Sequence, residues 1–285
     1  MTILSLGAGV QSSTLALMAS YQELPVPDAA IFADTGWEPK AVYAWLDWLE
    51  SYLAFPVYRV SRANIHKDLL ARKNATDQRF ASIPAYTWNG GMSRRQCTRE
   101  YKIEPIIRKI RELGGGPKAP VEMWIGISQD EIRRMKPNRV KWIINRWPLI
   151  ERRMNRQDCL RWMREYGFPE PAKSSCIGCP FHDNGYWRRL KERSPKEFAE
   201  AVEVDKAIRD IPGFDYEQYL HRSLIPLDEV DLRSEEDMGQ GDMFDNECEG
   251  VCGMMCRTGL APSDVLRLID QTIGHALAQS EQEAK

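Results

Sequence analysis

The sequence predicts an α/β fold in which helices cover both faces of a parallel sheet, followed by a mainly helical C-terminal region that contains cysteines. Two observations support this prediction. Short apolar segments alternate with segments of helical periodicity over residues 2–61, and a β-α-β-α-β succession is typical of a parallel sheet covered by helices. A turn with two glycines joins the first apolar segment to the first helical one, and glycines let a chain turn tightly after a strand.

The order of the elements follows from local signals. Pro39 is typical of the first position of a helix, and the run Gly114-Gly115-Gly116 is expected to end one. Residues 72–97 are polar and irregular, and a loop of this length is often functional. Strands are expected over 2–6, 29–33, 57–61 and 122–127, and helices over 11–20, 39–53 and 98–113.

Helical patterns dominate from Pro148 onward, which predicts a domain boundary near residue 147. Residues 1–147 are therefore expected to form the sheet domain, and residues 148–285 a helical region with most of the cysteines. The sequence contains no repeat, and it does not specify an oligomeric state.

Composition favours a cytoplasmic protein. The 285-residue chain is 43% hydrophobic and 28% charged, and it has no apolar run long enough to span a bilayer. No basic segment precedes the first expected strand, so we expect neither an export signal nor a membrane anchor. Seven cysteines, an odd number, argue against a disulfide framework and favour free thiols or metal ligands.

The stretch from Ser5 to Leu15, S-L-G-A-G-V-Q-S-S-T-L, predicts an anion site. A helix that begins directly after a glycine turn points its free N–H groups at the turn, and a phosphate is the expected guest. The stretch lacks both the Gly-Lys-Ser/Thr of a Walker loop and the third glycine of a G-x-G-x-x-G motif. An empty structural turn is the alternative. The candidate ligand-binding residues are Ser5, Gly7, Gly9, Gln11, Ser12 and Ser13.

Polar residues follow two further expected strands. Asp34-Thr35-Gly36 comes after the second strand, and Ser128, Glu131 and Arg134 come after the strand at 122–127. Ligands of open parallel sheets bind beyond the carboxyl ends of the strands, so we expect these groups to share one site. Asp34 is suited to a metal, a ribose or a base edge; the alternative is a cap on the helix that begins near Pro39.

The cysteines predict a second centre. Cys176 and Cys179 form a C-x-x-C pair, in which Gly178 permits the turn, and the spacing suits zinc, an iron-sulfur cluster or a redox dithiol. Cys97 precedes a basic helix, and Cys248 and Cys252 are candidate further ligands, with Cys256 beyond them. Cys159 lies in an apolar helical pattern and is expected to be a buried packing residue.

Charge is distributed unevenly along the chain. Residues 93–166 carry 19 Lys and Arg against 9 Asp and Glu, whereas residues 197–249 carry 4 against 17. The uneven charge is explained either by two solvated faces or by a basic surface for a polyanion. Tyr86, Trp88 and Trp142 are candidate stacking residues if that polyanion is a nucleic acid.

Taken in order, these motifs resemble the phosphoadenosine phosphosulfate (PAPS) reductase family of the adenine nucleotide alpha hydrolase (PP-loop) superfamily, and its branch that uses ATP for sulfur transfer. The family's Ser-Gly-Gly-x-Asp-Ser loop resembles Gly7-Ala8-Gly9-Val10-Gln11-Ser12, and its Asp-Thr-Gly is present as Asp34-Thr35-Gly36. Further similar segments are Cys97-Thr98-Arg99 with Lys102 and Pro105, Gly126 to Glu131 with Arg134, and the run from Pro148-Leu149 into Ile177-Gly178-Cys179.

The resemblance implies a Rossmann-like (HUP-type) sheet and an ATP pyrophosphatase with an iron-sulfur cluster. It implies ATP or another adenine nucleotide, with Mg as a candidate companion, at the residues named for the three strand ends. A 4Fe-4S cluster is implied at Cys97, Cys176, Cys179 and either Cys248 or Cys252, with zinc as the alternative. Asp34, Lys102 and Arg134 are the candidate catalytic residues. The implied partners are a nucleic-acid substrate and a sulfur donor protein.

Three departures from the family pattern leave other functions open. Gln11 replaces the acid of the family's loop, Gln96 precedes a single Cys97 where cluster-bearing members have a Cys pair, and Asn246-Glu247-Cys248-Glu249-Gly250 replaces a Glu-Cys-Gly-x-His motif. The first alternative is a sulfonucleotide reductase. The second is a nucleotide- and metal-binding module without catalysis.

Overall fold

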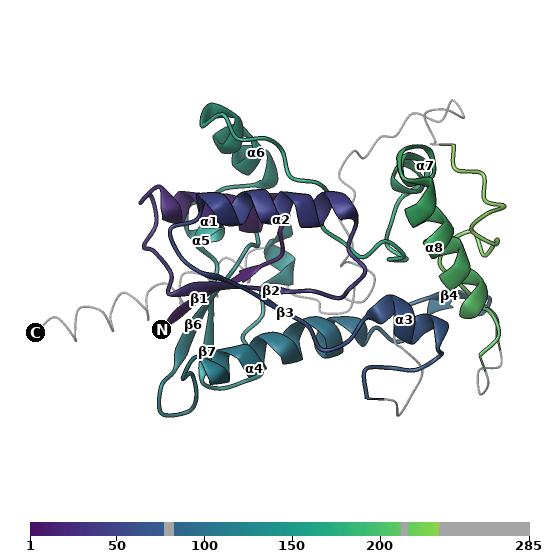
Figure 1. Cartoon of the computed structure of the whole chain (residues 1–285), viewed down its shortest axis with the longest axis horizontal. Coiled ribbons are helices and arrows are strands. Elements are labelled where there is room, and N and C mark those ends of the chain that lie inside the picture. Colours follow the sequence, from purple (N-terminus) through teal and green to yellow (C-terminus); the bar gives the residue numbers. More distant parts are fainter. Residues whose placement is uncertain (77–82, 212–215, 234–285) are drawn as a thin grey trace, which may run out of the picture. The chain divides into compact units, whose positions relative to one another are not determined.

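The computed structural model describes residues 1–76, 83–211 and 216–233. Its centre is a five-stranded parallel sheet in the order β3-β2-β1-β6-β7 (Figure 1). The sheet confirms the predicted α/β, Rossmann-like architecture. Its strands are β1 (Thr2–Leu6), β2 (Ala29–Ala33), β3 (Val57–Val60), β6 (Val121–Ile125) and β7 (Ile143–Arg146).

Helices cover both faces of this sheet (Figure 1). The apolar residues of β1 alternate, so that Leu4 and Leu6 pack with the helices on one face while Ile3 packs with α4 on the other. One face carries α1 (Val10–Ser20), α2 (Lys40–Tyr52), α5 (Pro148–Glu151) and α6 (Arg156–Glu165), and the other carries α4 (Glu104–Glu112).

The direction of the chain across the sheet reverses at β1. From β1 the chain crosses to β2 and then β3, and it later returns to β6 on the other side of β1. In such sheets, ligands bind in the crevice where this reversal separates two neighbouring strands at their carboxyl ends. The expected ligand site therefore lies beyond β1 and β6.

A second, smaller assembly lies beside the sheet and has a core of its own. It contains α3 (Ile65–Leu70), α7 (Asn184–Arg193), α8 (Pro195–Ala207) and a three-stranded antiparallel sheet. The strands of that sheet are β4 (Tyr86–Thr87), β5 (Gly91–Met92) and β8 (Gln218–Tyr219), in the order β5-β4-β8. Trp187 is fully buried in this second core.

Several elements differ from the sequence prediction. The helix expected over 98–113 is divided into a π-type segment, Thr98–Ile103, and α4. The loop at 72–97 contains the short strands β4 and β5, and the strand β7 was not predicted. Residues 1–245 form one compact unit, within which α6 packs on α1; the functional division at residue 147 stays a prediction. No helix in the described ranges has the length and apolarity to cross a membrane.

Candidate functional site

The segment from Gly7 to Ser12, which we call the first loop, leaves the N-terminus of α1 without a side-chain cap at the carboxyl edge of the sheet. Gly9 precedes α1 without a side-chain cap, and the first turn of α1 has no acidic residue. The Ser12 hydroxyl accepts a hydrogen bond from the Gly7 N–H at 3.1 Å and donates to the Gly9 carbonyl at 3.4 Å. Ala8 adopts a left-handed conformation with φ of 56°. A non-glycine residue in that conformation is a strained feature typical of ligand loops.

Two predicted loop residues are placed away from this helix end. The Ser13 hydroxyl is buried and accepts a hydrogen bond from the Trp45 indole at 3.0 Å, while the Ser13 N–H donates to the Gly9 carbonyl. Ser5 lies within β1, between Ile31 of β2 and Ile125 of β6. The Ser13 hydroxyl is therefore held by the fold and Ser5 belongs to the sheet, so the contacts at the helix end come from Gly7 to Ser12.

Gln11 joins the first loop to the end of β6 across the expected crevice. Its amide nitrogen donates to the Ser128 hydroxyl and to the Glu131 carboxylate, each at 3.3 Å. Glu131 is also paired with Arg134. An acid at position 11 would face the Glu131 carboxylate, whereas an amide donates to it. Gln11 therefore suits a loop that lies against Glu131.

Gly126 determines how closely these two loops approach. A Cβ atom at Gly126 would lie 2.8 Å from the Ser12 nitrogen and 2.9 Å from the Ser12 Cα. Backbone atoms cannot yield as a flexible side chain does, so a larger residue at this position would push the start of α1 away from β6. Position 126 therefore requires glycine for space.

The end of β2 forms the second side of the site. Asp34 accepts hydrogen bonds from the Gly36 N–H and from the Tyr43 hydroxyl, both at 2.7 Å. Burial and the neighbouring Asp34 carboxylate raise the pKa of Tyr43, so this hydroxyl stays a donor. Gly36 has a φ of 73°, a conformation that favours glycine, and lies against Asn64. Asp34 is thus oriented by two donors and keeps its second oxygen for a further partner.

The C-x-x-C segment meets the end of β2. The Cys176 sulfur lies 3.2 Å from the Thr35 hydroxyl and 3.7 Å from the Glu38 carboxylate. Glu38 is 3% exposed, accepts a hydrogen bond from Lys102 at 3.2 Å, and has a second oxygen without a hydrogen-bond partner. A thiol, a carboxylate and an ammonium group therefore converge beyond the end of β2.

Neighbouring charges and burial determine the protonation states of Lys102 and Cys176. Burial lowers the pKa of Lys102, but the neighbouring Glu38 carboxylate raises it by more, so the net shift is upward and the ammonium is retained. Burial and then Glu38 raise the pKa of Cys176 well above its usual value, although Lys102 acts in the opposite direction. Without a bound metal, Cys176 is therefore a neutral thiol at pH 7.

The π-type turn Thr98–Ile103 explains why Lys102 and Cys97 lie close together. Such a turn closes hydrogen bonds between residues five apart, which brings Cys97 and Lys102 over one another. Burial raises the pKa of Cys179, and Cys97 is one of the charges that raise it further, so these two thiols are within electrostatic range. In the described parts of the chain, however, no three His, Cys, Asp or Glu residues are positioned to hold a metal ion.

The other cysteines have different positions. Cys159 is fully buried in the core beneath α1, which confirms its expected packing role. Cys248 and Cys252, the candidate fourth ligands, and Cys256 lie outside the described residues.

Trp37 and His182 hold the C-x-x-C segment in place. The Ile177 N–H donates to the Trp37 carbonyl at 2.9 Å, and His182 Nε2 contacts the Cys176 carbonyl at 3.0 Å. A Cβ atom at Gly178 would lie 2.1 Å from the Trp37 ring. Gly178 is therefore required because the indole packs against it; its φ is not in the left-handed range. This corrects the sequence interpretation, in which the turn itself required glycine.

No role was assigned to Glu38 or to Trp37 from the sequence. Both follow the Asp34-Thr35-Gly36 motif directly, and an acid so close to a strand end was a usable signal. No local signal identifies Trp37, because its partner Gly178 lies 141 positions further along the chain.

The chain was compared with known proteins. No model of a protein family matches it, and no curated protein sequence matches it. Among solved structures, a crystal structure of phosphoadenylyl-sulfate (PAPS) reductase from Candida auris, in complex with phosphate, matches with a TM-score of 0.40 and 16% sequence identity. The match covers 60% of this chain and 74% of that chain.

Proposed function

We propose that this chain is an ATP pyrophosphatase that activates an acceptor for sulfur transfer at the neighbouring thiols. The single observation that carries the proposal is the 3.2 Å separation between the Cys176 sulfur and the Thr35 hydroxyl. It links the candidate nucleotide loops to the C-x-x-C pair, although the two residues are far apart in the sequence. The motif order described above supports an adenine nucleotide as the ligand.

The first loop supplies the phosphate contacts in this proposal. The free N–H groups at the start of α1, together with Gly7, Gly9 and Ser12, bind the leaving pyrophosphate, because the helix dipole favours an anion there. Gln11 and Ser128 hold the loop against the end of β6. Arg134, anchored by Glu131, neutralises charge that develops on the phosphates.

The segment after β2, Asp34 to Gly36, orients the nucleoside. Asp34 faces the ligand with its second oxygen and binds the ribose, a base edge or Mg²⁺, while Thr35 and Gly36 shape the path of the backbone. Lys102, retained as an ammonium by Glu38, is positioned on the thiol side of the site. There it stabilises negative charge on the acceptor or on sulfur.

The reaction balances in two displacements. An acceptor oxygen bonds to the α-phosphorus as the bond from that phosphorus to the bridging oxygen breaks, and pyrophosphate leaves toward α1. A sulfur nucleophile then bonds to the acceptor carbon as the carbon–oxygen bond breaks, and AMP leaves. Adenylation comes first because an unactivated oxygen is a poor leaving group.

The thiols fit a soft metal centre by their chemistry. Cys97, Cys176 and Cys179 are thiols near a cation, and thiolates suit both zinc and iron-sulfur clusters, although these three do not surround a common metal position in the described residues. One buried oxygen of Glu38, the carboxylate beside Cys176, has no hydrogen-bond partner, which leaves a polar contact there to be filled. These three residues would hold a 4Fe-4S cluster, or zinc, with Cys248 or Cys252 as the fourth ligand. When bound, a cluster with an open iron position would present sulfur to the acceptor.

The test combines turnover with metal analysis. Anaerobically purified protein is incubated with α-labelled ATP and Mg²⁺, with and without nucleic-acid acceptors, and we expect AMP and pyrophosphate in equal amounts. Iron, acid-labile sulfide and zinc are measured in the same preparation. Cys176→Ser is expected to abolish the metal content, whereas the matched control Cys159→Ser retains it.

The outcomes separate the alternatives. Nucleotide binding without turnover of any acceptor would contradict the enzyme and favour a non-catalytic module. Release of sulfite from PAPS, with no cleavage of ATP, would favour the sulfonucleotide reductase. Equal metal content in Cys176→Ser and Cys159→Ser would overturn the proposed ligands.

A further inference from the structure

The face of the sheet that α4 covers has a concentration of unpaired positive charge. Five exposed cations lie on α4, on the turn that follows it and on the segment before β7. Within the described ranges, none of the five forms an ion pair with an acid. We call them the α4 cations: Arg108, Arg111, Lys118, Arg139 and Lys141.

The packing of the sheet explains why these charges point outward. Ile106 and Ile110 of α4 are buried against the sheet, so Arg108 and Arg111 occupy the opposite side of the helix. Val140 and Trp142 pack against the same core. The residues that alternate with them, Arg139 and Lys141, therefore face solvent.

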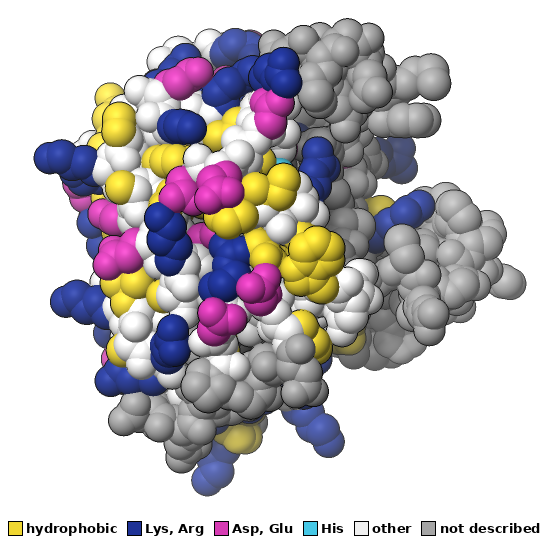
Figure 2. Space-filling model, turned by 90° about the vertical axis from the view of Figure 1, so that its right-hand side faces the viewer, with side chains coloured by type: hydrophobic (Ala, Val, Ile, Leu, Met, Phe, Trp, Pro, Cys, Tyr) yellow, Lys and Arg dark blue, Asp and Glu magenta, His cyan; other side chains and the backbone are white. Residues whose placement is uncertain are grey.

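The face that carries α7 and α8 is different. Figure 2 shows positive and negative side chains next to one another on that face. Ion pairs among the residues around α7 and α8 include Lys206 with Asp228 and Lys173 with Asp183. The positive charge over α4 is therefore a local feature and does not reflect the net charge of the chain, which is −2.

Aromatic rings lie among the α4 cations. The Arg111 guanidinium is 5.8 Å from the centre of the Trp142 ring, and the Lys109 ammonium is 4.4 Å from the centre of the Tyr58 ring. Trp142 and Tyr58 are both partly buried at the edge of the core. Cations beside aromatic faces are the usual components of surfaces that bind single-stranded nucleic acid.

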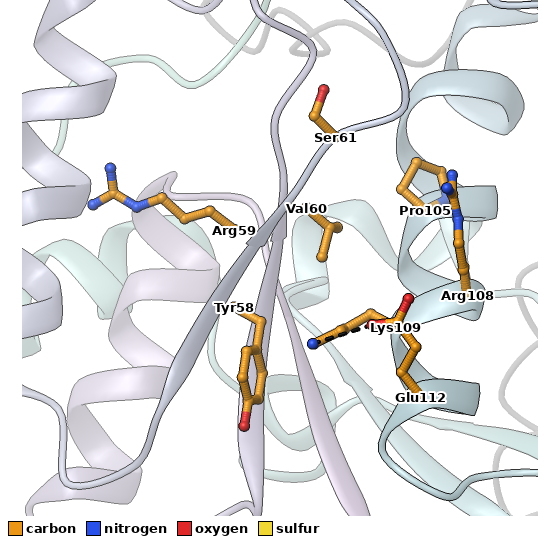
Figure 3. Close-up of a pocket in the computed structure, with 8 residues that line it drawn as sticks. All are labelled: Tyr58, Arg59, Val60, Ser61, Pro105, Arg108, Lys109 and Glu112. Atoms are coloured by element: carbon orange, nitrogen blue, oxygen red, sulfur yellow. Dashed lines mark hydrogen bonds and ion pairs between the residues drawn. The ribbon is translucent and has the colours of Figure 1, made fainter.

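A pocket of about 290 Å³ lies between β3 and α4 (Figure 3). Tyr58 and Val60 form one wall, and Arg108 and Lys109 lie across from them on α4. Arg59 points away from α4 in this view, toward its partners Asp47 and Glu50. Glu112 lies beside them and is paired with Lys109 at 3.2 Å, so the pocket offers an aromatic wall beside one cation that is unpaired within the described residues, Arg108, a combination that suits a base and its phosphate.

We propose that the α4 cations, with Trp142 and Tyr58, form a binding surface for single-stranded nucleic acid. Phosphates contact the cations, and unstacked bases contact the two rings. A duplex would offer phosphates but hide its base faces, which is why the rings favour a single strand. This binding does not require the proposed nucleotide chemistry, because no residue of the surface belongs to the candidate nucleotide site.

The test measures binding of fluorescein-labelled dT20 by anisotropy, without ATP or Mg²⁺, at several salt concentrations. We expect affinity to fall with salt, by a slope of about 0.7 per phosphate contact. The variant Arg108→Gln/Arg111→Gln/Lys141→Gln is expected to lower that slope by about 2, and affinity at low salt by about tenfold or more. Trp142→Leu is expected to lower affinity but to leave the slope unchanged, because stacking is not electrostatic.

The matched control removes three exposed cations from α7 and α8. We expect Lys191→Gln/Arg193→Gln/Lys196→Gln to bind dT20 as the wild type does. Far-UV circular dichroism and urea midpoints check that each variant folds; if the triple α4 variant is unstable, the single variants Arg108→Gln and Lys141→Gln replace it.

Several results would overturn the proposal: no binding of dT20, equal losses in the two triple variants, or equal binding of duplex DNA. Equal binding of a 20-residue polyglutamate, or of phosphatidylcholine vesicles with phosphatidylserine, would show a general anion surface instead. A failure of ATP cleavage would leave these outcomes unaffected, so the two proposals fail separately.

Discussion

Replacing Lys102 by Met tests the group at the centre of the site. The change leaves the Glu38 carboxylate, which is 3% exposed, without the cation that lies 3.2 Å away. Removing one partner of a fully buried ion pair costs about 3–5 kcal/mol, and an unsatisfied buried acceptor costs about 1–3 kcal/mol. The Lys102 side chain is 39% exposed, so solvent already screens the pair. We therefore expect Lys102→Met to lower the free energy of unfolding by about 2 kcal/mol.

The companion variants make this reasoning falsifiable. Glu38→Gln removes the buried charge, so the double variant is expected to be more stable than Lys102→Met alone. Urea unfolding followed by tryptophan fluorescence measures all three variants, and Lys206→Met, which breaks the exposed pair with Asp228, is the control with no measurable change. Losses that simply add in the double variant would refute a coupled pair.

Three further changes test other contacts of the site and its support. Gly178→Ala should lower the free energy of unfolding by about 1–3 kcal/mol, because its methyl group would overlap the Trp37 ring; an unchanged urea midpoint would contradict this packing. Gln11→Glu should destabilise the protein at pH 7 by placing a second carboxylate beside Glu131, and the loss should shrink below about pH 4, where carboxyls protonate; a loss independent of pH would exclude charge repulsion. His221 contacts Ser223 and Asn184, at the start of α7, and burial lowers its pKa to about 4, so stability should fall as pH decreases from about 6.5 to 4, since the unfolded chain binds the proton first; His221→Gln should flatten this part of the urea-midpoint profile, and an identical slope would refute the contribution of His221 to it.

Much of the fold followed from the sequence because local signals agreed with the tertiary structure. The strands at 2–6 and 29–33 were predicted with their observed bounds, since each is a short apolar run that both faces of the sheet bury. The break in the helix at Ile103 was not predictable, because a π-type segment has no distinct composition. The strand β7 was missed because the pairing of Ile143 with Val121, not its own sequence, selects the extended form.

The candidate site was predictable where polar residues follow strands. Asp34 and Ser128 lie at the strand ends where the pattern put them. The structure adds contacts between distant segments, such as Gly126 against Ser12 and Cys176 against Thr35. Such contacts depend on the packing of the whole unit, and a single sequence gives no signal for them.

Binding of ATP to a pair of glycine variants tests the central claim most directly. A Cβ at Gly126 would meet the Ser12 backbone at 2.8 Å, whereas a Cβ at Gly116 would meet nothing within 4 Å. Isothermal titration with Mg-ATP is expected to show binding to the wild type and to Gly116→Ala, and at least a tenfold loss, about 1.4 kcal/mol, in a folded Gly126→Ala variant. No binding by the wild type, or equal binding by the two variants, would contradict a nucleotide site between α1 and β6.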